Sequence, residues 1–66
     1  MTIVVNGEER EATEGLTVKG LLGELGLDRD GVAVAVDRRV VPRSRHAETR
    51  LGSGAKVEII RAVGGG

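Results

Sequence analysis

Apolar residues occur along the chain in short blocks of strand length, separated by turn residues and by one segment of helical spacing. Residues 2–5 are mostly β-branched and lead into Asn6-Gly7, the dipeptide most typical of a two-residue hairpin turn. A second strand is expected over residues 8–12, where alternating charges are typical of a partly solvated edge strand. The pattern predicts a hairpin at the start of the chain.

The segment after this hairpin has the spacing of an amphipathic helix. Thr17 is a good N-cap residue, and Gly26 is a natural residue with which to end the helix. Between them, apolar side chains recur every three or four residues, at Val18, Leu21, Leu22 and Leu25. Gly20 and Gly23 each weaken a helix by about 1 kcal/mol relative to Ala. The helix must therefore be stabilised by burial of its apolar stripe.

The second half of the chain predicts three more strands. Residues 32–36 form a continuous apolar run, as in a strand covered on both faces or partly covered. A short strand over residues 39–41 ends at Pro42, and residues 44–49 have room for one helical turn. The β-branched residues 56–62 form the last strand. This order of elements predicts a compact α+β domain with the helix on one face of a sheet of four to five strands.

Size and composition limit the chain to one small domain. It has 66 residues, 39% of them hydrophobic, and no aromatic residue, so the core must consist of Val, Ile, Leu and Ala. We expect a folded domain over residues 1–63 and a flexible C-terminal tail over residues 64–66. A net charge of zero disfavours a nucleic-acid coating role, and the absence of a long apolar run predicts a soluble, cytoplasmic protein.

The chemistry available to the side chains is limited. The chain has no cysteine, which removes disulfides, thiolate metal sites and cysteine nucleophiles. The single histidine, His46, is expected at the surface or in a turn, and no metal site is predicted. An enzyme would have to use scattered groups without catalytic spacing, namely Glu8, Glu9, Asp28, Asp30 and His46. We therefore do not expect an enzyme.

The three glycines at the end of the sequence are the remaining candidate for chemistry. Residues without Cβ can thread a narrow channel, so Gly64 and Gly65 could deliver the carboxylate of Gly66 into another protein's active site. Adenylation of that carboxylate by a partner that uses ATP, followed by attack of a sulfur donor, would produce a thiocarboxylate. The alternative is a non-reactive binding module of the same fold in which the glycines are a frayed end or a linker.

Taken together, the residues of the whole chain resemble the ThiS family, the sulfur carriers of thiamine biosynthesis, which have the ubiquitin-like β-grasp fold. The resemblance rests on the following residues: Asn6-Gly7, Thr17-Val18, Leu21-Leu22, Val34-Ala35-Val36, Val40-Val41-Pro42-Arg43, Gly54 and Gly65-Gly66. It implies a mixed sheet packed on one helix.

The resemblance also implies partners. A ThiF-type adenylyltransferase would use ATP to activate Gly66, and a cysteine desulfurase or another persulfide donor would supply the sulfur. A ThiG-type thiazole synthase would then take the sulfur into the thiazole ring. The chain itself would bind no cofactor and would be a protein co-substrate. Related carriers serve molybdopterin synthesis or tRNA thiolation, and modifiers are conjugated through the same glycine; these alternatives stay open here.

Alternation along the last strand suggests where partners dock. If Val57 and Ile59 face the helix, Ile60 and Ala62 face outward, and with Val63 they would form a partner-binding patch beside the tail. The alternative is that Ile60 completes the core. Nearby arginines, namely Arg43, Arg45 and Arg61, could pair with acidic partner residues or could simply be solvated.

Overall fold

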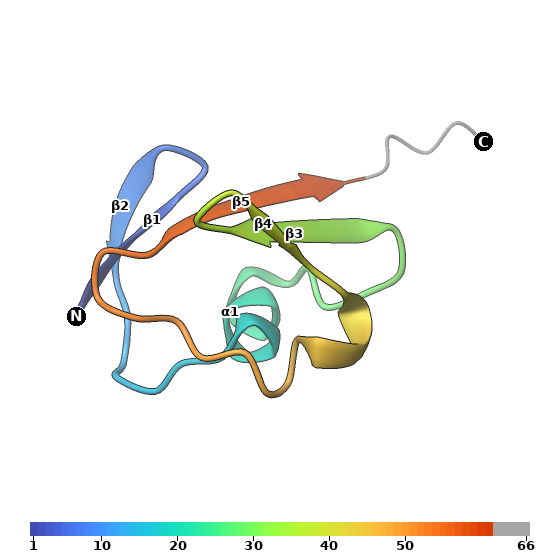
Figure 1. Ribbon diagram of the computed structural model, residues 1–66, viewed down its shortest axis with the longest axis horizontal. Coiled ribbons are helices and arrows are strands. Elements are labelled where there is room, and N and C mark those ends of the chain that lie inside the picture. The colour runs from blue at the N-terminus through green and yellow to red at the C-terminus, as the bar shows by residue number, and fades with distance from the viewer. Residues whose placement is uncertain (62–66) are drawn as a thin grey trace.

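The computed structural model describes residues 1–61, which form one mixed sheet covered on one face by a helix (Figure 1). The elements are β1 (Thr2–Val5), β2 (Glu8–Glu11), α1 (Val18–Leu25), β3 (Val32–Val36), β4 (Arg39–Val41), the 3-10 helix η1 (Arg43–Arg45) and β5 (Lys56–Arg61). The strand order is β2-β1-β5-β3-β4, and only the central pair, β1 and β5, is parallel. This confirms the predicted α+β architecture, a β-grasp sheet on one helix.

The predicted elements are confirmed, with small shifts at their ends. β2 lies at a sheet edge as expected and ends at Glu11, one residue before the predicted end. The helical turn predicted over residues 44–49 is a 3-10 turn over Arg43–Arg45. It begins directly after Pro42, whose carbonyl accepts a hydrogen bond from the Arg45 N–H at 2.8 Å. The ring of Pro42 removes a strand donor, so β4 ends there and the turn begins.

The core lies between α1 and the inner face of the sheet. Its buried residues come from the sheet, from the helix and from the loop before β5: Ile3, Val34, Val57, Ile59, Val18, Leu21, Leu22, Leu51 and Ala55. Burial of one such Val, Leu or Ile side chain stabilises the fold by about 1.5–3 kcal/mol. Aliphatic side chains alone thus close the core, as the composition predicts.

The N-terminus of α1 is held by the loop that follows η1. The Val18 N–H donates to the Thr49 carbonyl at 2.9 Å, and the Lys19 N–H donates to the His46 carbonyl at 3.0 Å. The Thr17 hydroxyl accepts from the Gly20 N–H at 3.0 Å, as predicted for an N-cap. Three backbone donors of the first turn are therefore satisfied by groups outside the helix.

His46 is a turn residue, but the expectation that it could lie at the surface is wrong. Its residue is only 5% exposed, and its Nε2 lies 3.0 Å from the Val41 carbonyl, to which it donates. The imidazole thus joins the end of β4 to the loop that caps α1. A local pattern could not reveal this, because the surrounding positions, Arg45 and Ala47, are exposed.

α1 has only eight residues, and no helix within residues 1–61 is long and apolar enough to cross a membrane.

Candidate functional site

β5 leads directly to the residues on which the expected chemistry depends. It is the central strand of the sheet and ends at Arg61. Gly64, Gly65 and Gly66, and the predicted docking residues Ala62 and Val63, lie outside the described residues. The division of the chain at residue 63 into a domain and a tail therefore stays a prediction. What the structure does describe is the strand that precedes them and the surfaces around its end.

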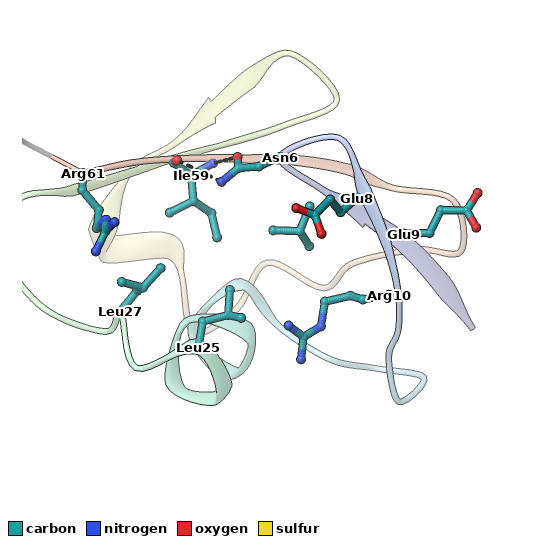
Figure 2. A pocket seen from close by; sticks show the side chains of 9 residues that line it. Asn6, Glu8, Glu9, Arg10, Leu25, Leu27, Ile59 and Arg61 are labelled. Atoms are coloured by element: carbon teal, nitrogen blue, oxygen red, sulfur yellow. Dashed lines mark hydrogen bonds between the residues drawn. The ribbon is translucent and has the colours of Figure 1, made fainter.

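The end of β5 is fixed from both sides, although only one side is a strand. On one side Ala33 pairs with Ile60 and Val32 with Arg61. On the other side β1 reaches only as far as Val57, and the side chain of Asn6 continues the pairing (Figure 2). Its Oδ1 accepts from the Ile59 N–H at 2.8 Å, and its Nδ2 donates to the Ile59 carbonyl at 3.4 Å. Asn6 thus stabilises the strand two residues before its described end.

An exposed apolar patch lies on the outer face of the sheet, away from α1. We name Ala33, Ala35, Val40 and Ile60 the outer-face patch. The sheet register sets Ile60 beside Ala33, and Ala35 beside Val40. Ile60 is 62% exposed and Val40 is 75% exposed, and they are the two large hydrophobic residues that stand out to solvent within residues 1–61. The small side chains of Ala33 and Ala35 between them do not block access of a partner to this surface.

The patch decides between the two interpretations of Ile60. The neighbouring Ile59 is buried and Ile60 is exposed, so the alternative that Ile60 completes the core is wrong. Period-two alternation along β5 was sufficient to expect this. The sequence did not indicate that Val40 belongs to the patch, because its position beside Ala35 depends on the pairing of β3 with β4. Alternation around the buried Val34 could have placed Ala33 and Ala35 on the outer face.

A second feature is an open groove of about 430 Å³ on the helix side of the sheet. Figure 2 shows Leu25 and Leu27 below β5, Ile59 above them, Arg61 at one end and the side chains of β2 at the other. The groove is lined by Val5, Asn6, Glu8, Glu9, Arg10, Leu25, Leu27, Ile59 and Arg61. Its rim carries both signs of charge, and Arg10 is already paired with Glu24 at 3.4 Å.

Of the polar groups that an enzyme would need, Glu8 and Glu9 line the groove, but the others do not join them there. Asp28 pairs with Lys19 at 3.4 Å, and Asp30 pairs with Arg43 at 3.1 Å. His46 is buried against Val41 and does not line the groove. Within residues 1–61, no group of three or more His, Cys, Asp or Glu residues could hold a metal ion.

Comparison with known proteins gives a consistent result. The model of the ThiS family matches residues 3–66. The sulfur carrier protein ThiS of Escherichia coli is 29% identical over 66 residues, which cover all of both chains. A thiazole synthase of Paramagnetospirillum magneticum is 46% identical over the whole chain, and one of Magnetococcus marinus is 36% identical. The chain spans about a fifth of the length of these two synthases.

A solved structure has the same fold. The crystal structure of the thiamine biosynthesis protein ThiS from Geobacter metallireducens matches with a TM-score of 0.85 and 30% identity, and all of both chains are covered.

A five-stranded β-grasp sheet on one helix, with an exposed apolar patch beside the end of its central strand, defines a ubiquitin-like domain. Over the whole length of both chains, the matches reported above are to the sulfur carrier protein ThiS of Escherichia coli and to the ThiS structure from Geobacter metallireducens. The chain belongs to the ThiS family.

Proposed function

We propose that this chain carries sulfur for the thiazole ring of thiamine as a thiocarboxylate on Gly66. The observation that supports this most directly is the whole-length match to the ThiS family, which includes residues 64–66. In the proposed role the chain is a co-substrate. It supplies no catalytic side chain, and the chemistry is done by the enzymes that bind it.

The proposed chemistry begins with an activating enzyme of the ThiF type. A carboxylate oxygen of Gly66 attacks the α-phosphorus of ATP, which releases pyrophosphate and forms an acyl adenylate. A persulfide from a cysteine desulfurase or another donor attacks the carbonyl carbon and expels AMP. A thiol then reduces the sulfur–sulfur bond, so that the thiocarboxylate is left on the carrier. ATP is used by the activating enzyme, and the cytoplasm, where ATP is abundant, is the proposed location.

The proposed acceptor is a thiazole synthase of the ThiG type. Two relatives named thiazole synthase each contain a segment similar to this whole chain. A carrier-like segment within a thiazole synthase supports a working contact between the two proteins.

The outer-face patch, together with Ala62 and Val63, is the proposed docking surface. Ile60 and Val40 are exposed apolar residues on neighbouring parts of one sheet face. Such residues contribute strongly to binding when a partner buries them. Ile60 also lies one residue before the end of β5, so a partner bound at the patch is close to the start of the proposed tail. Docking and delivery of the glycine carboxylate would then be coupled by position.

The test is intact-protein mass spectrometry after incubation of the chain with ATP, a ThiF-type enzyme, a cysteine desulfurase, cysteine and a thiol reductant. The unmodified mass first verifies that the chain used ends at Gly66. We expect a gain of about 16 Da, the replacement of one oxygen atom by sulfur. Deletion of Gly66 or replacement of Gly65 by Leu should leave the fold intact and abolish the gain. Conversion of either variant at the wild-type rate would contradict the proposal.

A further inference from the structure

The two halves of the chain carry opposite charge, although the net charge is zero. Residues 1–31 contain seven acidic and three basic residues, a net charge of −4. Residues 32–66 contain three acidic and seven basic residues, a net charge of +4. A neutral total therefore conceals a strong separation of charge along the sequence.

The fold places part of each set of charges at opposite edges of the sheet, while Glu24, Asp28 and Asp30 lie on α1 and in the loop after it. β2, with Glu8, Glu9 and Glu11, is one edge of the sheet, and β4 with its preceding turn is the other. Four strand spacings lie between them, which is about 19 Å. At the β4 edge four consecutive residues, Asp37 to Val40, are exposed, and we name Arg38, Arg39 and Val40 the basic edge. Val40 belongs also to the outer-face patch.

The backbone of Arg38 has a positive φ angle, which is unfavourable for an arginine. Val36 pairs with Arg39, so Asp37 and Arg38 form a two-residue hairpin loop, and their φ angles are 50° and 70°. The hairpin between β1 and β2 has the same form, with Asn6 at 51° and Gly7 at 84°. Glycine is the residue that adopts the second position without a steric penalty. An arginine there lowers the stability of the fold, and such strain is typical of positions retained for function.

The turn is nevertheless held rigidly by its other residue. The Asp37 N–H donates to the Lys56 carbonyl at 2.8 Å, and Asp37 Oδ1 accepts from the Lys56 N–H at 3.0 Å. Arg38 is thus presented from a fixed backbone.

The arginines of the basic edge also differ from Arg43 and Arg45 in having no ion pair within residues 1–61. Arg43 lies 3.1 Å from Asp30, and Arg45 lies 4.0 Å from Glu48. Within residues 1–61, no carboxylate lies within ion-pair distance of Arg38 or Arg39. Two of the three arginines that the sequence suggested for partner contacts, Arg43 and Arg45, therefore form ion pairs within the chain. In the described part of the chain, Arg38 and Arg39 are therefore unpaired charges near Val40, as Arg61 is next to Ile60.

We propose that the basic edge docks on an acidic surface of the enzymes that bind this carrier, and that Arg38 is a specificity residue of that contact. The inference rests on the proposed function, because it adds an electrostatic edge to the same docking surface. Val40, on the outer face, supplies the apolar contact, and Arg38, in the turn before β4, supplies charge near it. Arg39 pairs with Val36 and adds its charge on the inner side of the same edge. The acidic β2 edge, on the opposite side of the sheet, disfavours the reverse orientation, so the charge separation sets how the carrier approaches.

A protein partner fits these observations better than a nucleic acid. The chain has no aromatic side chain on which a base could stack, and the acidic edge would repel phosphates. An exposed valine on a sheet edge that also carries arginines instead matches the combination of apolar and charged groups in a protein interface.

The test compares Arg38→Gly and Arg39→Gln with a control, Arg10→Gln, which removes a positive charge at the opposite edge. Association rates of the full chains with the ThiF-type enzyme and with the thiazole synthase are measured at low and high ionic strength. We expect each basic-edge variant to associate about threefold more slowly at low salt with at least one enzyme, with a shallower salt dependence. The control should associate no more slowly than the wild type.

Thermal unfolding of Arg38→Gly separates function from structure. We expect its midpoint to rise, because glycine relieves the positive φ, while its association slows. A lower midpoint would make Arg38 a structural residue and overturn the inference. Unchanged association of both basic-edge variants with both enzymes, or a wild-type chain that binds neither enzyme, would also overturn it.

The outcomes also separate this inference from the proposed function. Failure of the proposed function is a wild-type chain that gains no mass in the sulfur-transfer assay. Failure of the present inference is a chain that is converted while its basic-edge variants associate normally. Binding of a single-stranded RNA that Arg38→Gly abolishes, without any effect on the enzymes, would overturn the assignment of a protein partner.

Discussion

At the scale of single residues, two hairpin loops of the same geometry contain different chemistry. Asn6-Gly7 has the residues that positive φ angles favour, and Asp37-Arg38 does not. Asn6 has a second role that its dipeptide does not indicate, because its side chain pairs with the backbone of Ile59, 53 residues away. It acts as a strand partner for β5 where β1 has ended.

The substitution Asn6→Gly isolates this second role. Glycine adopts the same turn but leaves the partly buried Ile59 N–H without its acceptor. We expect the free energy of unfolding to fall by about 1–3 kcal/mol in urea titrations. The variant Asn6→Asp keeps the acceptor and should lose less. A stability of Asn6→Gly within about 0.5 kcal/mol of the wild type would show that the side-chain pairing is unimportant.

At the scale of elements, α1 is stabilised by its surroundings more than by its own sequence. Eight residues with two glycines would not form a helix alone. The loop over residues 46–49 satisfies its first backbone donors, Thr17 and Gly26 cap its two ends, and its apolar stripe is buried. Gly26, at φ 71°, ends the helix as its sequence predicts.

The two glycines inside α1 should respond differently to alanine. A Cβ at Gly23 would meet no atom within 4 Å, so Gly23→Ala should raise the free energy of unfolding by about 1 kcal/mol. A Cβ at Gly20 would lie 2.9 Å from Cδ1 of Leu16, and this side chain would have to move. Gly20→Ala should therefore gain less. Equal gains in thermal or urea unfolding would mean that Leu16 moves without penalty.

At the scale of the whole molecule, the two faces of the sheet have separate tasks. The inner face closes the core on α1, and the outer face, at the β5, β3 and β4 end, leaves Ile60 and Val40 exposed. Residues that stabilise the fold and residues proposed for docking thus lie on opposite faces of the sheet, as the adjacent Ile59 and Ile60 show.

Adjacent substitutions in β5 should therefore have opposite consequences. Ile60→Glu should leave the unfolding midpoint nearly unchanged and weaken binding to the activating enzyme on the order of tenfold, because a charge enters the docking patch. Ile59→Glu should unfold the domain, because an unpaired charge would be buried in the core. Circular dichroism and binding titrations give both readouts. An Ile60→Glu chain that binds normally would remove Ile60 from the docking surface.

Much of the fold follows from local chemistry in the sequence. The hairpin at Asn6-Gly7, the caps of α1 and the end of β4 at Pro42 depend on the conformations of one or two residues. The face of each residue in β5 follows from a period of two once one buried position is known. Exposure of Ile60, the described residue of the predicted docking patch, was predictable for that reason.

The sequence by itself determined the elements, the aliphatic core and the glycines on which the proposed chemistry depends, because these are properties of neighbouring residues. Only the tertiary structure decided the contacts between distant ones. It set Val40 beside Ala35, buried His46 against Val41, joined Asn6 to Ile59 and placed the acidic strand β2 and the arginine-bearing strand β4 at opposite sheet edges. These features depend on strand order and register, which are fixed by packing across the whole domain.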